Sequence, residues 1–235
     1  MPGASLWIIP PPDSHFSKII QSLITTTIPT SHFPHTETHT FIPHVTITSD
    51  IPLNRLPLSK APQSATVNDE PDFQAWLGNL HLDMASTDED EESIAVALER
   101  LEAGDAFTKK LTIKCEKSAS LLSLAASCRA QAVDLFTAAP TAARGWATEQ
   151  YLPHMSLMYA SLPTPEVREQ IEAIQQDVHN ASRHLSTDDQ GVVATGGSLV
   201  LVDTSKPISQ WQIVAERELP QLRWMSPWAK SGFDD

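Results

Sequence analysis

Two short segments of the chain share a pattern of residue types that could carry out acid–base chemistry. Phe41–Ile47 reads FIPHVTI and Tyr151–Leu157 reads YLPHMSL. Both run aromatic, aliphatic, Pro, His, apolar, hydroxyl, apolar. Such a neighbourhood around two of the nine histidines is improbable by chance at ordinary residue frequencies. The repeat therefore predicts an internal duplication that keeps a histidine and a hydroxyl two positions apart.

The spacing within each segment has a physical reason if both segments are β-strands. Residues i and i+2 of a strand point to the same face, so His44 projects with Thr46, and His154 with Ser156. Two such strands lying side by side would form one cleft. One imidazole could take a proton from water while the other protonates a departing oxygen, and the two hydroxyls could donate to phosphate oxygens. The pattern predicts hydrolysis of a phosphodiester without a metal.

The histidines around the first segment suggest a second possibility. His32, His35, His39 and His44 lie close together in the sequence, and three histidines can hold a catalytic zinc ion. Metal ligands usually lie on defined elements, however, whereas this stretch is polar and loop-like with Pro34 inside it. If His44 belongs to the cleft, the other three are better interpreted as exposed loop residues. We therefore expect no metal and no cofactor.

Other reactive residues are better explained without a site. Cys115 and Cys128 provide no disulfide framework, and we expect both to be buried as small apolar side chains. The acidic run Asp88–Glu92 lacks the alternating ligands and the turn glycine of a calcium loop, so it is interpreted as a solvated loop.

Composition limits the classes of protein that fit. The chain has 235 residues, 41% of them hydrophobic, and a formal charge of −13. This charge argues against a protein that grips long nucleic acid, which needs a basic surface. No apolar run approaches the roughly 20 residues of a membrane span, and Met1–Pro10 lacks the basic region of a signal peptide. We expect an intracellular monomer, cytoplasmic by default, although association with an internal membrane is compatible with the sequence.

The elements that must position the two histidines follow from periodicity and punctuation. Leu6–Ile9, Phe41–Ser49 and Tyr151–Tyr159 are predicted strands, and Ser198–Asp203 with Gln210–Glu216 a closing hairpin before an extended tail. Predicted helices run from Asp13 or Ser14 to about Thr25, and over Glu70–Leu82, Lys117–Phe136 and Thr164–Leu185. Ile94–Leu101 fits a helix or a strand, and as a strand it would turn at Gly104 into Phe107–Cys115. The order strand, helix, strand occurs twice along the chain, which predicts an α+β protein with antiparallel sheets.

At its two histidine segments the chain resembles the 2H phosphoesterases, and within them the cyclic nucleotide phosphodiesterases of fungi and plants. The second segment continues as YLPHMSLMY, so that Tyr159 follows His154 by five positions. The stretch from Ser5 to Trp7 before PPDS is similar to the family's opening strand and turn, and WQIVA from Trp211 to its closing strand. The likeness covers nearly the whole chain.

The resemblance implies a fold and a domain organisation. Residues 1–235 would form one bilobal 2H phosphoesterase domain, with two antiparallel sheets related by a pseudo-twofold axis, helices on the outer faces and the site in the groove between the lobes. Ile94–Leu101 would then be a strand. Residues 60–70, 86–93 and 186–197 would be loop insertions outside the cleft.

The resemblance also implies a reaction and roles. Water would open a nucleoside 2′,3′-cyclic phosphate to the 2′-phosphate, and ADP-ribose 1″,2″-cyclic phosphate from tRNA splicing is a second possible substrate. His44 and His154 would be the acid/base pair, and Thr46 and Ser156 would hold the phosphate. Trp7 and Tyr159 would also face the cleft and contact the substrate, although each also fits ordinary core packing.

Two alternatives remain open at this point. A non-catalytic module could keep the fold to bind a nucleotide or an RNA end, although such proteins usually lose a catalytic group that is present here. A phosphodiesterase for RNA ends or 2′–5′ linkages would act on a polymer, which the charge of −13 disfavours. A local basic patch around Lys109 and Lys110 could change that balance.

Overall fold

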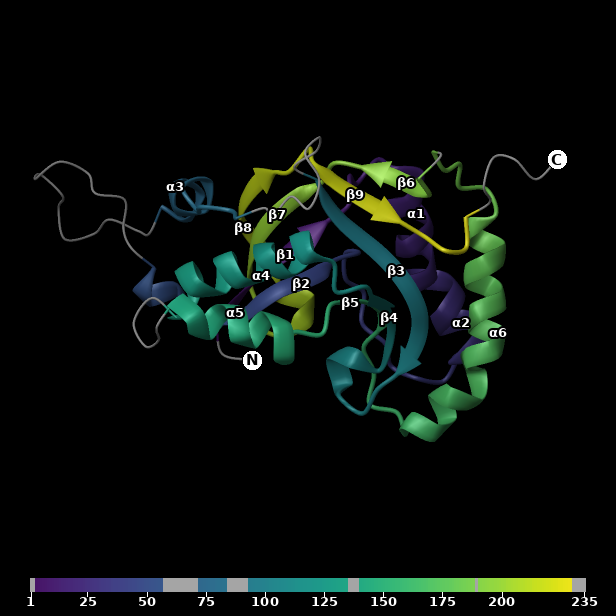
Figure 1. Cartoon of the computed structure of the whole chain (residues 1–235). Helices are drawn as coiled ribbons and strands as arrows, with labels where there is room; N and C mark the ends of the chain where they lie inside the picture. Colours follow the sequence, from purple (N-terminus) through teal and green to yellow (C-terminus); the bar gives the residue numbers. More distant parts are fainter. Residues whose placement is uncertain (1–2, 57–71, 84–92, 135–139, 189, 230–235) are drawn as a thin grey trace, which may run out of the picture.

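The sheet that positions the histidine segments has nine strands. The structure is a computed structural model that describes residues 3–56, 72–83, 93–134, 140–188 and 190–229. The strands lie in the order β6-β9-β3-β4-β5-β2-β1-β7-β8, and the sheet is strongly curled (Figure 1). They are β1 (Ala4–Ile9), β2 (Val45–Ile51), β3 (Ile94–Ala103), β4 (Leu111–Cys115), β5 (His154–Met158), β6 (Val192–Thr195), β7 (Ser198–Asp203), β8 (Gln212–Glu218) and β9 (Leu222–Met225). The predicted α+β class is confirmed.

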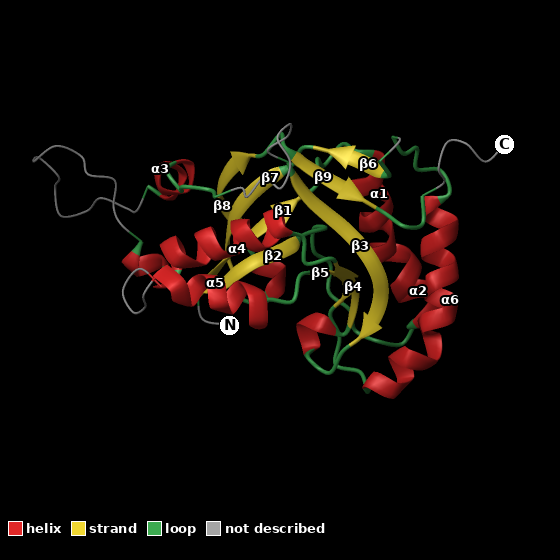
Figure 2. Ribbon diagram, viewed as in Figure 1, coloured by secondary structure: helices red, strands yellow, loops and turns green. Residues whose placement is uncertain are grey.

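Helices cover the sheet in two groups (Figure 2). The first contains α1 (His15–Ser22), continued by the π-helical turn η1 (Leu23–Thr27) and α2 (Ile28–His32), and packs with α6 (Thr164–Ser182). The second pairs α4 (Ala119–Ala132) with α5 (Pro140–Glu149) beside β2. The short elements are α3 (Phe73–Gly78), η2 (Leu53–Arg55), η3 (Phe107–Lys109) and η5 (Ile208–Gln210). None of the helices in these ranges is long and apolar enough to cross a membrane.

Capping and burial explain where the helices begin. Ser14 caps α1 by accepting a hydrogen bond from the Ser17 amide at 3.1 Å, and Ser118 caps α4 in the same way. The first helix was expected to end near Thr25, and this end is wrong: the helical chain runs on to His32. Buried Ile24 and Ile28 continue its apolar face, and the π-helical turn leads the chain to Pro29 near the start of α2.

The open choice at Ile94–Leu101 is resolved as a strand. Ile94, Val96 and Leu98 are all buried, which is the two-residue period of a strand with one covered face. The expectation of purely antiparallel sheets is wrong at one place. The segment expected as an extended tail forms β9, and it pairs parallel with β3, with Ile94 opposite Leu222.

Other expected boundaries also need correction. The predicted strand within 41–49 begins only at Val45 and that within 151–159 only at His154, because the prolines before both histidines cannot donate to a ladder. The helix predicted over 70–82 spans only Phe73–Gly78 in the described part, and α5 was not predicted. The 186–197 segment, expected as a loop, contains β6. Residues 60–70 and 86–92 lie outside the described residues.

Candidate active site

The two histidine segments meet at the centre of the sheet. β2 and β5 are antiparallel neighbours, and Val45 pairs with Met155, the residue after the histidine in each segment. Partners in an antiparallel pair step in opposite directions. This register therefore directs His44 toward Ser156 across the strands and Thr46 toward His154. Both imidazoles line one cavity of about 240 Å³, as the sequence predicts for a shared cleft.

Each imidazole is held by the same hydrogen bond. Nδ1 of His44 lies 2.7 Å from the carbonyl oxygen of Ile42, and Nδ1 of His154 lies 2.8 Å from that of Leu152. A carbonyl can only accept, so each Nδ1 carries the proton and donates it. Each Nε2 is then an unprotonated acceptor, which is the tautomer that a general base requires.

The prolines of the repeat explain this arrangement. Pro43 and Pro153 lie between each carbonyl and its histidine, and both are buried. A proline holds the preceding residue in an extended conformation and contributes no amide hydrogen to a neighbouring strand. The carbonyls before them are therefore available to the imidazole two residues on. Proline at this place orients the ring and is part of the site.

Burial favours the neutral form of both rings. His44 is 3% exposed, and burial lowers its pKa from 6.5 to about 4, with the nearby His154 adding to the effect and the Ile42 carbonyl opposing it. Burial also lowers the pKa of the half-buried His154, and the Lys109 charge acts in the same direction, whereas the Leu152 carbonyl and Glu102 raise it.

Trp7 contacts the first imidazole directly. Its ring stacks on His44 with 3.7 Å between centroids and 11° between planes, and the residue is only 4% exposed. Trp7 lines the cavity as predicted, but one of its faces is occupied by the imidazole. In this arrangement Trp7 fixes and desolvates His44. Trp211, which the sequence indicated only as part of a closing strand, meets Trp7 edge-on at 5.7 Å and lines the same cavity.

Tyr159 approaches the same imidazole from another side. Its hydroxyl lies 3.4 Å from Nε2 of His44, and its ring stacks on Phe41 at 4.0 Å. Since Nε2 is the unprotonated nitrogen, the phenol is the donor. Burial raises the pKa of Tyr159, so this proton stays in place near neutrality. Tyr159 thus lines the cavity as predicted and also supports His44.

The two hydroxyls of the repeat differ in position. Thr46 lines the cavity, and its carbonyl accepts a hydrogen bond from the Tyr151 hydroxyl at 3.0 Å. Ser156 is 3% exposed, is absent from the cavity lining and donates to the Thr108 carbonyl at 3.1 Å. Ser156 therefore supports the segment that carries Thr108 and Lys109.

Lys109 is the residue of the site that the motif analysis did not assign. It lies at the end of η3 and lines the cavity. Apart from the two titratable histidines, it is the only basic or acidic side chain among the lining residues that the structure describes. A cation in this position suits an anionic substrate in a protein whose formal charge is −13. The cluster of lysines in the sequence was a usable signal for it.

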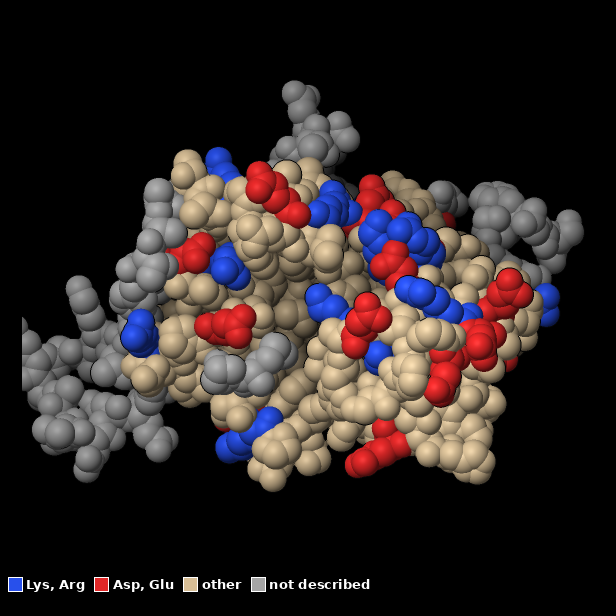
Figure 3. Space-filling view, turned by 90° about the horizontal axis from the view of Figure 1, so that it is seen from below, with Lys and Arg blue, Asp and Glu red and all other residues tan. Residues whose placement is uncertain are grey.

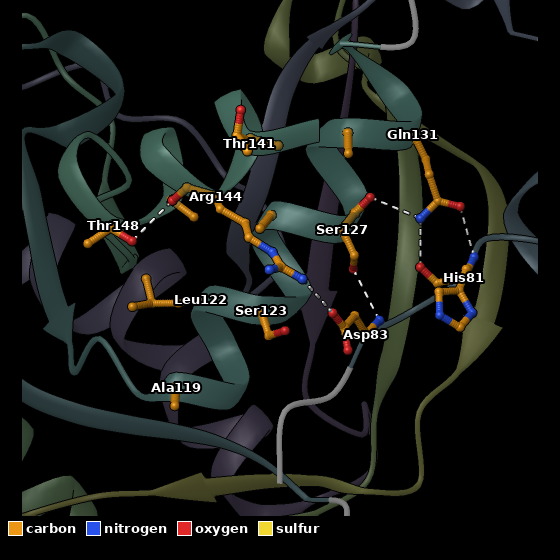
Figure 4. A pocket seen from close by; sticks show the side chains of 14 residues that line it. His81, Asp83, Ala119, Leu122, Ser123, Ser127, Gln131, Thr141, Arg144 and Thr148 are labelled. Carbon is orange, nitrogen blue, oxygen red and sulfur yellow. Dashed lines mark hydrogen bonds and ion pairs between the residues drawn. The ribbon is translucent and has the colours of Figure 1, made fainter. Parts of the chain in front are cut away.

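A larger cavity, of about 790 Å³, lies elsewhere, between α4, α5 and residues 81–83 (Figure 4). It contains none of the motif residues. Its polar groups are largely paired with one another: Arg144 with Asp83 at 3.7 Å, and the Gln131 amide with the His81 backbone on both sides. Size alone therefore does not make it the candidate site, because both repeated histidine segments line the smaller cavity instead.

Comparison with known proteins agrees with this geometry. Residues 1–219 match the family described as cyclic phosphodiesterase-like protein. This chain belongs to that family. Among curated proteins, a 2′,3′-cyclic-nucleotide 3′-phosphodiesterase of Phaeosphaeria nodorum is 38% identical over 219 residues, covering 93% of this chain and 100% of the relative. Proteins of the same name from Neurospora crassa and Yarrowia lipolytica are 27% and 26% identical, covering 93% and 92% of this chain and 100% and 99% of the relatives.

Membership of the cyclic phosphodiesterase-like family confirms the resemblance drawn from the two histidine segments. The competing zinc hypothesis finds no support in the arrangement of the histidines. The expectation that His32 is an exposed loop residue is wrong, because it is the last residue of α2 and its side chain, 8% exposed, pairs with Asp177 at 2.8 Å. The ring of His39 meets Phe107 edge-on. In the ranges that the structure describes, no group of three or more His, Cys, Asp or Glu side chains could hold a metal ion. Cys115 and Cys128 are buried free thiols, as expected.

Proposed function

We propose that this protein hydrolyses nucleoside 2′,3′-cyclic phosphates to nucleoside 2′-phosphates. The observation that supports this most directly is the shared cavity of His44 and His154, each with Nδ1 bonded to a carbonyl and Nε2 available. The curated relatives are named for that reaction. The hydrolysis product has a free 3′-hydroxyl, because the bond from phosphorus to the 3′ oxygen is the one that breaks.

The two imidazoles have different tasks in this reaction. His44, the more deeply buried, accepts a proton from the attacking water as a new P–O bond forms. His154, the less deeply buried of the two, gives a proton to the 3′ oxygen as its bond to phosphorus breaks. The anionic substrate raises the pKa of the imidazole beside it, so substrate binding promotes the proton uptake that the acid requires.

The remaining groups bind the phosphate. Thr46 donates to a non-bridging oxygen, and the Lys109 ammonium balances the negative charge that grows on phosphorus-bound oxygens in the transition state. Trp7 and Tyr159 hold the His44 ring in position. Ser156, through the Thr108 carbonyl, supports the turn that presents Lys109. The residues of the cavity supply every proton transfer in this scheme.

A single set of reactions tests the function and the assignment of roles. Replacing His44 or His154 with Ala should each lower kcat by about 10²–10⁴. A substrate whose 3′ oxygen is replaced by sulfur has a leaving group that needs no protonation. His154→Ala should regain activity on this substrate, whereas His44→Ala should not. More than half the wild-type activity in either variant on the natural substrate would refute the assignment, and rescue of His44→Ala alone would reverse the two roles.

ADP-ribose 1″,2″-cyclic phosphate is a second proposed substrate of the same chemistry. Chromatography of the products from it and from the four 2′,3′-cyclic mononucleotides would rank the substrates and distinguish 2′- from 3′-monophosphates. A polymeric substrate is less well supported: on the face shown in Figure 3, basic and acidic side chains are interspersed around an uncharged hollow, with no broad basic surface in view. Tight nucleotide binding without turnover would instead favour the non-catalytic alternative.

The sheet order supports a further proposal about the fold. Outward from its centre, the sheet runs β5-β4-β3 on one side and β2-β1-β7 on the other. β1 and β2 are joined through α1, and β4 and β5 through α4 and α5. We propose that the two halves are related by a pseudo-twofold axis between β2 and β5, in one bilobal unit, as an internal duplication requires.

A further inference from the structure

The active-site cavity has two chemically different sides. On the β5 side it is lined by His154 and Lys109. The side formed by β2, β1 and the segment after β7 carries the Trp7 ring and the His44 imidazole, and its other polar side chains are neutral hydroxyls. Beyond Thr46 these are Ser5, Thr48, Ser49 and Thr204. Anionic phosphate belongs beside the imidazoles and the lysine, so the hydroxyl side is left for a neutral part of the ligand.

The Thr48 hydroxyl is an unpaired polar group within this wall. Thr48 is 2% exposed, and Oγ1 has no hydrogen-bond partner within the described part of the chain. Two other hydroxyls of the lining have partners: the Ser5 and Thr204 hydroxyls lie 3.4 Å apart, and Thr204 donates to the Gly3 carbonyl at 3.0 Å. Burying a hydroxyl without a partner destabilises a fold. A valine would fill the same volume without that cost, so the hydroxyl at this position indicates a ligand group.

A further part of the cavity lining comes from α5 and the residue that follows it. Trp146 and Gln150 line the cavity there. Trp146 is half-buried, and the Arg129 guanidinium lies over its ring, 4.3 Å from the centroid. The exposed Gln150 carries both a donor and an acceptor. Hydroxyls, an indole and an amide that line one cavity suit a planar, neutral group with donors and acceptors at its edge.

We infer that this side of the cavity is the nucleobase subsite, in which Thr48 hydrogen-bonds to the base. The inference rests on the proposed function. Thr46 and Thr48 are two positions apart on β2, about 7 Å along the strand, which leaves room for a ribose between the phosphate and the base. A rotation about χ1 exchanges the Thr48 hydroxyl and methyl without moving the strand. Because a hydroxyl both donates and accepts, this subsite discriminates weakly among the bases.

The test compares substrates with and without a base. The four 2′,3′-cyclic mononucleotides and 1-O-methylribofuranose 2,3-cyclic phosphate are assayed with wild type, Thr48→Val and Thr48→Ser. Thr195→Val, at the exposed last residue of β6 and outside the cavity lining, is the matched control. Thr48→Val should lower kcat/KM on the nucleotides about two- to tenfold, the effect of one lost hydrogen bond, and leave the methyl riboside unchanged. Thr48→Ser should retain wild-type values.

A second measurement separates binding from folding. Thr48→Val removes a buried unpaired hydroxyl, so its Tm should rise while its nucleotide kcat/KM falls, a combination that a misfolded variant cannot produce. If Thr48→Val lost equal kcat/KM on the nucleotides and on the methyl riboside, or lost none on either, the proposed subsite would be overturned. Ile213→Ala, in the neighbouring groove beyond Trp211, is assayed as well. A loss of nucleotide kcat/KM confined to this variant would also overturn the subsite. Wild type that turns over none of these substrates would refute the proposed function itself, and the subsite with it.

Discussion

The burial of His44 should make the stability of the protein depend on pH in a defined window. Its pKa is about 4 in the folded protein, against 6.5 for a solvated imidazole. Between these pH values the unfolded chain binds the proton and the folded protein does not, so the free energy of unfolding rises with pH. Each pH unit in the window is worth about 1.4 kcal/mol. Lowering the pH from 7 to 5 should therefore cost about 2 kcal/mol through His44.

Urea unfolding at several pH values between 7 and 5 measures this cost. His44→Gln cannot take up the proton, so its stability should fall by about 2 kcal/mol less than that of wild type over the same range. His184→Gln is the control, because His184 is an exposed surface residue and its loss should leave the wild-type slope. An NMR titration of the imidazole signals reports the same event directly. Equal slopes for wild type and His44→Gln, or a His44 resonance titrating near 6.5, would refute the argument from burial.

Two further substitutions test the surroundings of the imidazoles. Lys109→Met should lower kcat/KM about tenfold to a hundredfold, the range for a lost hydrogen bond to a charged group. Lys18→Met makes the same change of charge at an exposed position of α1 and should leave kcat/KM unchanged. Equal effects of the two substitutions would show that only net charge matters. Tyr159→Phe should lower kcat about two- to tenfold, with little change in the free energy of unfolding because the ring still stacks on Phe41. An unchanged kcat would show that the hydrogen bond from the phenol to His44 does not contribute to the reaction.

The geometry of the candidate site could be predicted from the sequence further than the fold around it. The repeated segments identified both imidazoles, because a strand places residues two apart on one face regardless of what surrounds it. They did not identify Lys109, which lies on a short turn whose position depends on the Ser156 hydroxyl and the Thr108 carbonyl. They also suggested equal parts for the two hydroxyls, whereas only Thr46 lines the cavity.

The two strands that escaped prediction share a physical reason. β9 and β6 are short and acquire their structure by pairing with strands distant in sequence: Ile94 with Leu222, and Val192 with Met225. Local patterns carry no information about such partners. The strand over 94–101 was ambiguous for the same reason, since buried alternation is visible only once the sheet and α4 cover it.

The proline before each histidine unites these observations. A strand alone would place the two imidazoles in the cleft, but it would leave their rings free to rotate and to choose either tautomer. The extended residue before proline presents a carbonyl that no strand partner requires, and the ring two positions later donates Nδ1–H to it, at 2.7 Å in one half and 2.8 Å in the other. In the proposed mechanism, Pro43 and Pro153 thus help to leave Nε2 of each ring as the nitrogen that faces the substrate. Replacing either proline with alanine should lower kcat more than it lowers stability, and an unchanged kcat in either variant would separate the prolines from the orientation of the imidazoles.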